Sequence, residues 1–150
     1  MFDINVISNI LLVDDDKTSI FLQTHLLTDV CKYEGNIEVC YNGKTALDFI
    51  KGQGEVHSNG GDLILPELIL LDINMPIMNG FQFLENYGQL DAKLRGGIVI
   101  SMLTSSLNSL DKEKAEAFME VSDFITKPLE KEALLEIVEK HFGDANKTDS

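Results

Sequence analysis

Basic residues are scarce in this chain. Lysine and arginine together number 12 among 150 residues, against 25 aspartates and glutamates, which gives a formal net charge of -13 at pH 7. Proteins that bind nucleic acids depend on basic side chains that neutralise phosphate groups. The same side chains attract proteins to anionic membrane surfaces. We therefore expect no direct contact with nucleic acid or with a membrane.

Long apolar runs are also missing. No stretch approaches the roughly 20 apolar residues that a membrane-spanning helix requires. Residues 1–9 contain neither the basic segment nor the apolar segment of an export signal. The sequence thus predicts a cytoplasmic protein, and 150 residues fit a single domain, with 143–150 as a polar tail.

The usual sequence signs of disulfides and of cysteine or histidine metal sites are absent. Cys31 and Cys40 form neither a CxxC motif nor part of a cysteine-rich framework. The three histidines, His25, His57 and His141, have no metal-ligand spacing. We expect reduced cysteines that pack, and histidines at or near the surface.

Residues 52–62 hold four glycines but no phosphate-binding motif. Neither GxxxxGK[ST] nor GxGxxG occurs there, and no strand pattern directly precedes the glycines. The composition favours an exposed, flexible loop inserted into the domain.

Short apolar runs alternate with segments of helical periodicity along the rest of the chain. This alternation is typical of βα units around a parallel sheet. The predicted strands are 10–13, 37–41, 68–71, 98–103 and 123–126. Helices are predicted at 17–30, at 44–51, from Asn79, at 108–121 and after Pro128. The predicted buried faces include Ile20, Phe21, Leu27 and Val30 in the first helix, Leu110, Ala117, Phe118 and Val121 in the fourth, and Leu134, Ile137, Val138 and Phe142 in the last.

Two of these apolar runs end in carboxylates. The run 68–71 does not alternate, as expected for a strand buried on both faces, and it leads into Asp72. The run 10–13 leads into Asp14 and Asp15. In open α/β sheets the carboxyl edge is where ligands bind. Clustered carboxylates at this edge repel one another unless a cation lies among them, and Mg²⁺ prefers such oxygen ligands.

Two more polar residues follow the later strands and complement the acids. Thr104 ends the fourth strand and Lys127 follows the fifth. If Asp72 attacked a phosphoryl group, the hydroxyl of Thr104 and the ammonium of Lys127 would suit the phosphoryl oxygens. We interpret Asp16, the third acid of its run, as the cap of the first helix instead.

These motifs together resemble the receiver domain of two-component response regulators. The resemblance covers roughly residues 8–142 and implies an α/β fold of the flavodoxin-like kind, with helices on both faces of a five-stranded parallel sheet in the order 2-1-3-4-5. Four motifs carry the resemblance: Val13-Asp14-Asp15, the segment from Leu71-Asp72 through Met75-Pro76 to Gly80, Thr104, and Lys127-Pro128.

The resemblance implies a role for each matched residue. Asp72 is the expected phosphoacceptor, and the expected Mg²⁺ ligands are Asp14, Asp15, Asp72 and the backbone carbonyl of Asn74. Thr104 and Lys127 are expected to contact the phosphoryl group, and with Asp72 they form the expected catalytic set. Phe124 is expected to switch with Thr104, and the bond before Pro128 is expected to be cis.

The implied function is a stand-alone signalling switch rather than an enzyme with a separate substrate. The expected donor is a sensor histidine kinase or a histidine phosphotransfer protein, and the output is a downstream protein target. Catalysis would be limited to self-phosphorylation and autodephosphorylation at Asp72. The chain departs from the family pattern in the loop 52–62 and in Ser105, where many relatives carry alanine.

Two alternatives remain at this point. The run Asp14-Asp15-Asp16-Lys17-Thr18 fits the DxDxT signature of haloacid dehalogenase-type phosphatases, with Asp14 as nucleophile, Asp16 as acid/base and Lys127 as the later lysine. That alternative leaves the Asp72 motif unexplained and lacks the later acidic pair. The other is a receiver fold that binds partners without phosphorylation.

Overall fold

A computed structural model describes residues 3–58, 60, 64–105 and 108–146, with the backbone alone described at 54–58 and 144–146. Five parallel strands form one sheet in the order β2-β1-β3-β4-β5. Their bounds are β1 Asn9–Val13, β2 Asn36–Cys40, β3 Leu68–Asp72, β4 Val99–Thr104 and β5 Val121–Thr126. The predicted flavodoxin-like strand order is confirmed.

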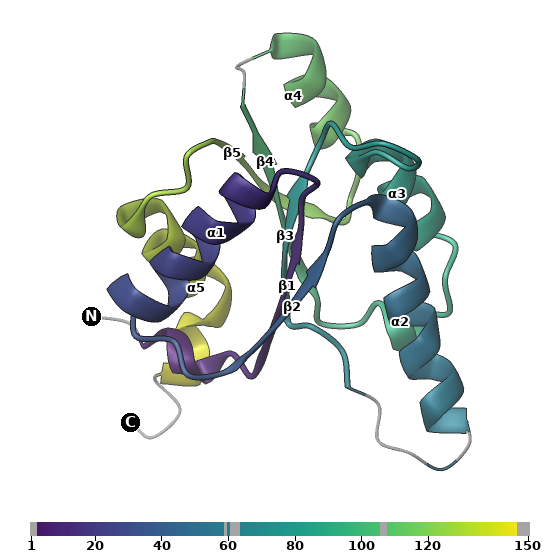
Figure 1. The fold of residues 1–150 in the computed structure, drawn as a ribbon. Coiled ribbons are helices and arrows are strands. Elements are labelled where there is room, and N and C mark those ends of the chain that lie inside the picture. Colours follow the sequence, from purple (N-terminus) through teal and green to yellow (C-terminus); the bar gives the residue numbers. More distant parts are fainter. Residues whose placement is uncertain (1–2, 59, 61–63, 106–107, 147–150) are drawn as a thin grey trace.

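Helices cover both faces of this sheet (Figure 1). The α-helices are α1 Lys17–His25, α2 Gly43–Ser58, α3 Gly80–Tyr87, α4 Ser109–Glu116 and α5 Lys131–Asn146. A π-helical turn, η2 Leu26–Val30, continues α1, and two 3₁₀ turns are η1 Ile4–Val6 and η3 Ala92–Leu94. Helices α1 and α5 lie on one face, and α2 and α3 lie on the other. None of the described helices is long and apolar enough to cross a membrane.

The core consists of two apolar clusters, one on each face of the sheet. All five residues of β3 are buried, because β3 lies in the centre of the sheet with helices on both sides. This double burial explains why the run 68–71 is apolar without alternation. It also fixes the backbone that ends in Asp72.

Helix α1 and the turn after it bury only part of the predicted face: Ile20 and Leu27 are buried as predicted, but Phe21 and Val30 are not. Phe21 is 68% exposed and Val30 is also exposed, whereas Ile20, Gln23 and Leu27 are buried. Positions 20, 23 and 27 lie on one side of a helix, and position 21 lies about 100° around it. Phe21 was predicted to be buried because it is apolar and was placed in the helical pattern, whereas the burial of Gln23 was not predicted.

The fourth helix is shorter than predicted, because α4 ends at Glu116 and Val121 already belongs to β5. Leu110, predicted to be buried, is 71% exposed, and Ala117 is exposed too. Ala115 is the buried residue of this helix. Five of its eight residues are charged, so its apolar pattern was too weak to set the boundaries or the buried face.

Two segments predicted to be irregular are partly helical. Helix α2 continues through Ser58 into the predicted loop 52–62, and α5 continues through Asn146 into the predicted tail 143–150. A glycine costs a helix only about 1 kcal/mol relative to alanine, so glycine content alone does not end a helix that has already begun. Residues 59, 61–63 and 147–150 lie outside the described part of the chain.

Candidate functional site: an acidic cluster at the carboxyl edge of the sheet

The acidic cluster arises because β1 and β3 are neighbours in the sheet. Val13 pairs with Leu71, so the residues that follow them, Asp14 and Asp72, emerge side by side. Both are buried, Asp14 to the point of 1% exposure, while Asp15 is exposed. One carboxylate oxygen from each of these three residues lies within 4.8 Å of the others. The structure thus brings together the acids that the sequence placed on separate strands.

Lys127 brings a positive charge into this cluster from the end of β5. Its backbone N–H donates to the carbonyl of Thr104, at 2.6 Å, which joins the ends of β4 and β5. Its Nζ lies 2.6 Å from Oδ2 of Asp14 and 3.3 Å from Oδ1 of Asp72. The bond between Lys127 and Pro128 is cis, as the resemblance implied.

The protonation of Asp72 reflects this crowding. Burial and the nearby carboxylate of Asp14 raise the pKa of Asp72 from 3.8 to about 6, although Lys127 opposes the change. Burial alone would lower the pKa of Lys127, but its contacts with Asp14 and Asp72 raise it instead. The lysine therefore stays charged, and Asp72 changes its protonation near neutral pH.

The loop after β3 is held by a close backbone approach at Gly80. The N–H of Gly80 donates to the carbonyl of Ile73 at 2.8 Å, and a Cβ at this position would collide with the carbonyl oxygen of Asp72. Asn79 caps α3 in a reciprocal capping box with Gln82. The glycine of the sequence motif is therefore required by contact with the backbone of the acidic strand itself.

The remaining predicted site residues occupy different environments. Thr104 is buried at the end of β4, next to the strand that ends in Asp72. Asn74 is exposed, two residues beyond Asp72. Phe124 is partly buried and packs against the core cluster that includes residues of α3 and α4. Asp16 caps α1 through a hydrogen bond from the N–H of Thr18, as predicted.

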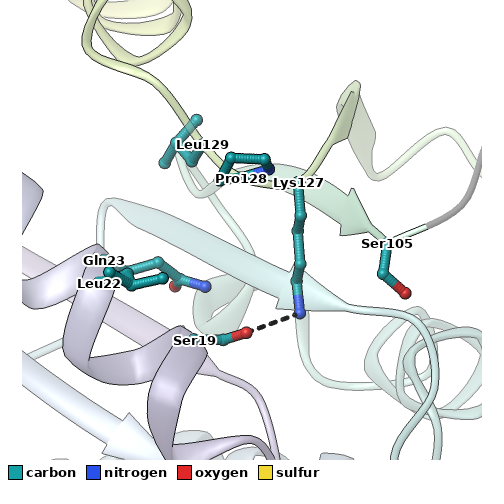
Figure 2. Close-up of a pocket in the computed structure, with 7 residues that line it drawn as sticks. All are labelled: Ser19, Leu22, Gln23, Ser105, Lys127, Pro128 and Leu129. Atoms are coloured by element: carbon teal, nitrogen blue, oxygen red, sulfur yellow. Dashed lines mark hydrogen bonds between the residues drawn. The ribbon is translucent and has the colours of Figure 1, made fainter.

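Two polar residues of α1 lie beside the acids but were not among the predicted site residues. Ser19 is 3.4 Å from Nζ of Lys127 through its Oγ, and Nε2 of Gln23 is 3.5 Å from Oδ2 of Asp14. Both residues line a cavity of about 250 Å³ together with Leu22, Ser105, Lys127, Pro128 and Leu129 (Figure 2). Their spacing of four residues puts them on one side of α1, so the sequence could have indicated that both face the acids.

Comparison with known proteins identifies the family. The family model of the response regulator receiver domain matches residues 10–139. The chain belongs to this family. Receiver domains serve two-component and phosphorelay signalling, so this receiver domain is a component of such systems. The phosphatase alternative built on Asp14 is not supported, and Asp16, its supposed acid/base, is the cap of α1.

Individual relatives agree with this assignment. The receiver domain is 33% identical over 129 residues to hybrid signal transduction histidine kinase I of Dictyostelium discoideum, covering 85% of this chain and 7% of the kinase. It is 34% identical over 105 residues to two-component response regulator 24 of Arabidopsis thaliana, covering 69% of this chain and 63% of that protein. The chain thus spans a small part of the kinase.

Solved structures show the same architecture at full length. A two-component response regulator from Cytophaga hutchinsonii matches with a TM-score of 0.75 and 31% identity, covering 91% of this chain and 98% of that one. A response regulator receiver protein from Dyadobacter fermentans matches with a TM-score of 0.74 and 29% identity, covering 89% and 97%. Each alignment therefore covers about nine tenths of this chain and nearly all of the solved structure.

Proposed function

We propose that this receiver domain is a Mg²⁺-dependent switch that accepts a phosphoryl group on Asp72. The observation that carries the proposal is the cluster of Asp14, Asp15 and Asp72, whose oxygens lie within 4.8 Å of one another, beside Lys127. Three acids and one lysine leave an excess of negative charge. A divalent cation would balance that excess, and because it would take one oxygen of Asp72, the other oxygen would stay available to react.

The residues present fit a magnesium ion. Asp14, Asp15 and Asp72 offer hard oxygen ligands, and the backbone carbonyl of Asn74 is the proposed fourth. When bound, the ion would supply charge neutralisation for the acids and for a phosphoryl group. The exposure of Asp15 leaves a route by which the ion can enter and keep some of its waters.

The proposed reaction moves one phosphoryl group. A carboxylate oxygen of Asp72 attacks phosphorus, an acyl phosphate bond forms, and the phosphorus–nitrogen bond of a phosphohistidine breaks. The imidazole leaves with the electron pair of that bond and takes a proton from solvent. The attacking carboxylate must be ionised. Burial and Asp14 raise the pKa of Asp72 to about 6 without a metal, and a bound Mg²⁺ would favour the ionised form. Lys127 and Thr104 would stabilise the phosphoryl oxygens.

The phosphohistidine would come from a histidine kinase or a phosphotransfer protein, and the signal would pass to a protein target. Hybrid histidine kinases are among the relatives, which supports a kinase as the source. Contact between Thr104 and the phosphoryl group would bias the packing of Phe124 on β5. A change in the surface formed by α4 and β5 would then be read by the target.

Substitution of the proposed acceptor tests the function. Asp72→Asn should abolish labelling by radioactive acetyl phosphate in the presence of Mg²⁺ and leave the circular dichroism spectrum unchanged. Asp48→Asn, at an exposed aspartate of α2, is the matched control and should label like the wild type. Mass spectrometry should place the label on Asp72. Persistent labelling of Asp72→Asn, or label on Asp14, would refute the proposal.

A further inference from the structure

Gln23 is a buried amide on the otherwise apolar inner face of α1. It is 5% exposed, and its neighbours on that face, Ile20 and Leu27, are buried hydrophobic residues. Burying an amide costs free energy unless its polar atoms find hydrogen-bond partners. An apolar side chain of similar size would fill the same space, so packing alone gives no reason for glutamine.

The contacts of Gln23 point toward the acidic cluster. Its Nε2 lies 3.5 Å from Oδ2 of Asp14, the same oxygen that Lys127 contacts at 2.6 Å. Its Oε1 is shielded from solvent and has no hydrogen-bond partner among the described residues. Figure 2 shows the side chain of Gln23 extending from α1 toward the side chain of Lys127.

The two oxygens of Asp14 are held differently. Oδ1 accepts from the backbone N–H of Asp16 at 2.9 Å, a contact fixed by the turn into α1. Oδ2 relies on side chains, namely Lys127 and Gln23. The ammonium of Lys127 is shared, because it also lies 3.3 Å from Oδ1 of Asp72. The printed hydrogen bond of the Gln23 amide, in contrast, goes to Asp14 alone.

We propose that Gln23 is a positioning residue that keeps the carboxylate of Asp14 oriented for the metal ion. This inference rests on the proposed Mg²⁺-dependent function. The amide N–H fixes Oδ2, and the open carbonyl oxygen is an acceptor of the kind that metal-bound water requires. Gln23 touches neither the phosphoryl group nor Asp72 in this role, and it acts through Asp14.

Calorimetric titration with MgCl₂ tests the inference on the intact chain. Gln23→Met removes both polar atoms at similar volume, and Gln23→Leu is a second variant with the same loss. Each should weaken Mg²⁺ binding about tenfold, as is typical for partners of metal ligands. Gln89→Met, the same change at an exposed position after α3, is the control and should bind Mg²⁺ like the wild type.

Thermal unfolding without Mg²⁺ separates positioning from packing. Under the proposal both Gln23 variants keep or raise the midpoint, because an imperfectly paired amide has been replaced by an apolar side chain. A lower midpoint in both variants would assign Gln23 a structural role and overturn the inference, as would Mg²⁺ affinity within twofold of wild type. If the wild type itself binds no Mg²⁺, the proposed function fails and takes the inference with it.

Discussion

Two polar clusters of this receiver domain are built around aspartates that are buried or partly buried, yet their net charges differ. At the edge of the sheet, Asp14 and Asp72 share Lys127. On the α5 side of β5, Asp123 is surrounded by possible donors. It accepts from Ser101 Oγ at 3.0 Å and lies 3.2 Å from Nζ of Lys140 and 2.9 Å from Nε2 of His141.

The two clusters differ in the balance between carboxylates and possible cations. Asp123 contacts three neighbours that can donate to its carboxylate, and these contacts join β4, β5 and α5. The cluster of Asp14, Asp15 and Asp72 has more carboxylates than cations, and burial together with the nearby Asp14 raises the pKa of Asp72. An excess of like charge is the feature that supports the proposed function at the sheet edge, whereas the contacts of Asp123 support a structural role.

Removing the lysine from each cluster should give the largest contrast. Lys127→Ala leaves two buried carboxylates without their cation and should lower the free energy of unfolding by about 3 kcal/mol at neutral pH. Lys140→Ala removes a lysine that is 61% exposed and should cost less than about 1 kcal/mol. Urea denaturation without Mg²⁺ measures both.

Added Mg²⁺ provides the control for this contrast. The ion should restore much of the stability of Lys127→Ala, because it replaces the missing positive charge among the acids, and it should leave Lys140→Ala unchanged. Equal losses in the two variants, or no recovery with Mg²⁺, would contradict the distinction between the clusters.

The dependence of the free energy of unfolding on pH should reveal the titration of Asp72 in the acidic cluster. The pKa of Asp72 is about 6 in the folded protein, above its ordinary value of 3.8. Between these two pH values the folded state binds more protons than the unfolded state. The contribution of Asp72 to the free energy of unfolding is therefore complete below about pH 3.8 and is lost as the pH rises through about 6. The difference between the two pKa values corresponds to a change of roughly 3 kcal/mol at most in the free energy of unfolding.

The pH measurement requires a comparison of variants, because other acids titrate in the same range. Urea denaturation of the wild type and of Asp72→Asn between pH 4 and 7.5 gives the part that belongs to Asp72. Their difference should change with pH in the absence of Mg²⁺ and flatten when Mg²⁺ holds the carboxylate ionised. Parallel profiles without Mg²⁺ would show that Asp72 titrates normally.

The sequence predicted those features that local patterns determine. The five strands and their order follow from apolar runs and recognised motifs, and Asp14, Asp72 and Lys127 meet because parallel strands end at one edge. Buried runs such as 68–71 have few alternative placements. The grouping of these acids with Lys127 was therefore predictable before any coordinates were known.

Features that depend on tertiary packing were harder to predict from the sequence. The rotation of α1 about its axis decides that Gln23 faces the core and Phe21 faces solvent, and residue hydrophobicity gives the opposite ranking. The extent of α2 beyond Gly52 depends on hydrogen bonds that composition does not reveal. The cluster around Asp123 joins residues from β4, β5 and α5 with no motif between them, so no sequence signal singled it out.

The smallest effect should come from Asp123→Asn. The amide keeps the shape of the carboxylate but loses its charge, so the contacts with Lys140 and His141 weaken and the free energy of unfolding should fall by about 1 kcal/mol. Labelling of Asp72 by acetyl phosphate should stay at the wild-type level, because Asp123 lies on the α5 side of β5, away from the acids. Urea denaturation and labelling, done on the same preparation, measure the two effects separately. A fall in labelling would mean that β5 transmits changes from Asp123 to Lys127, and the two clusters would then form a single functional unit.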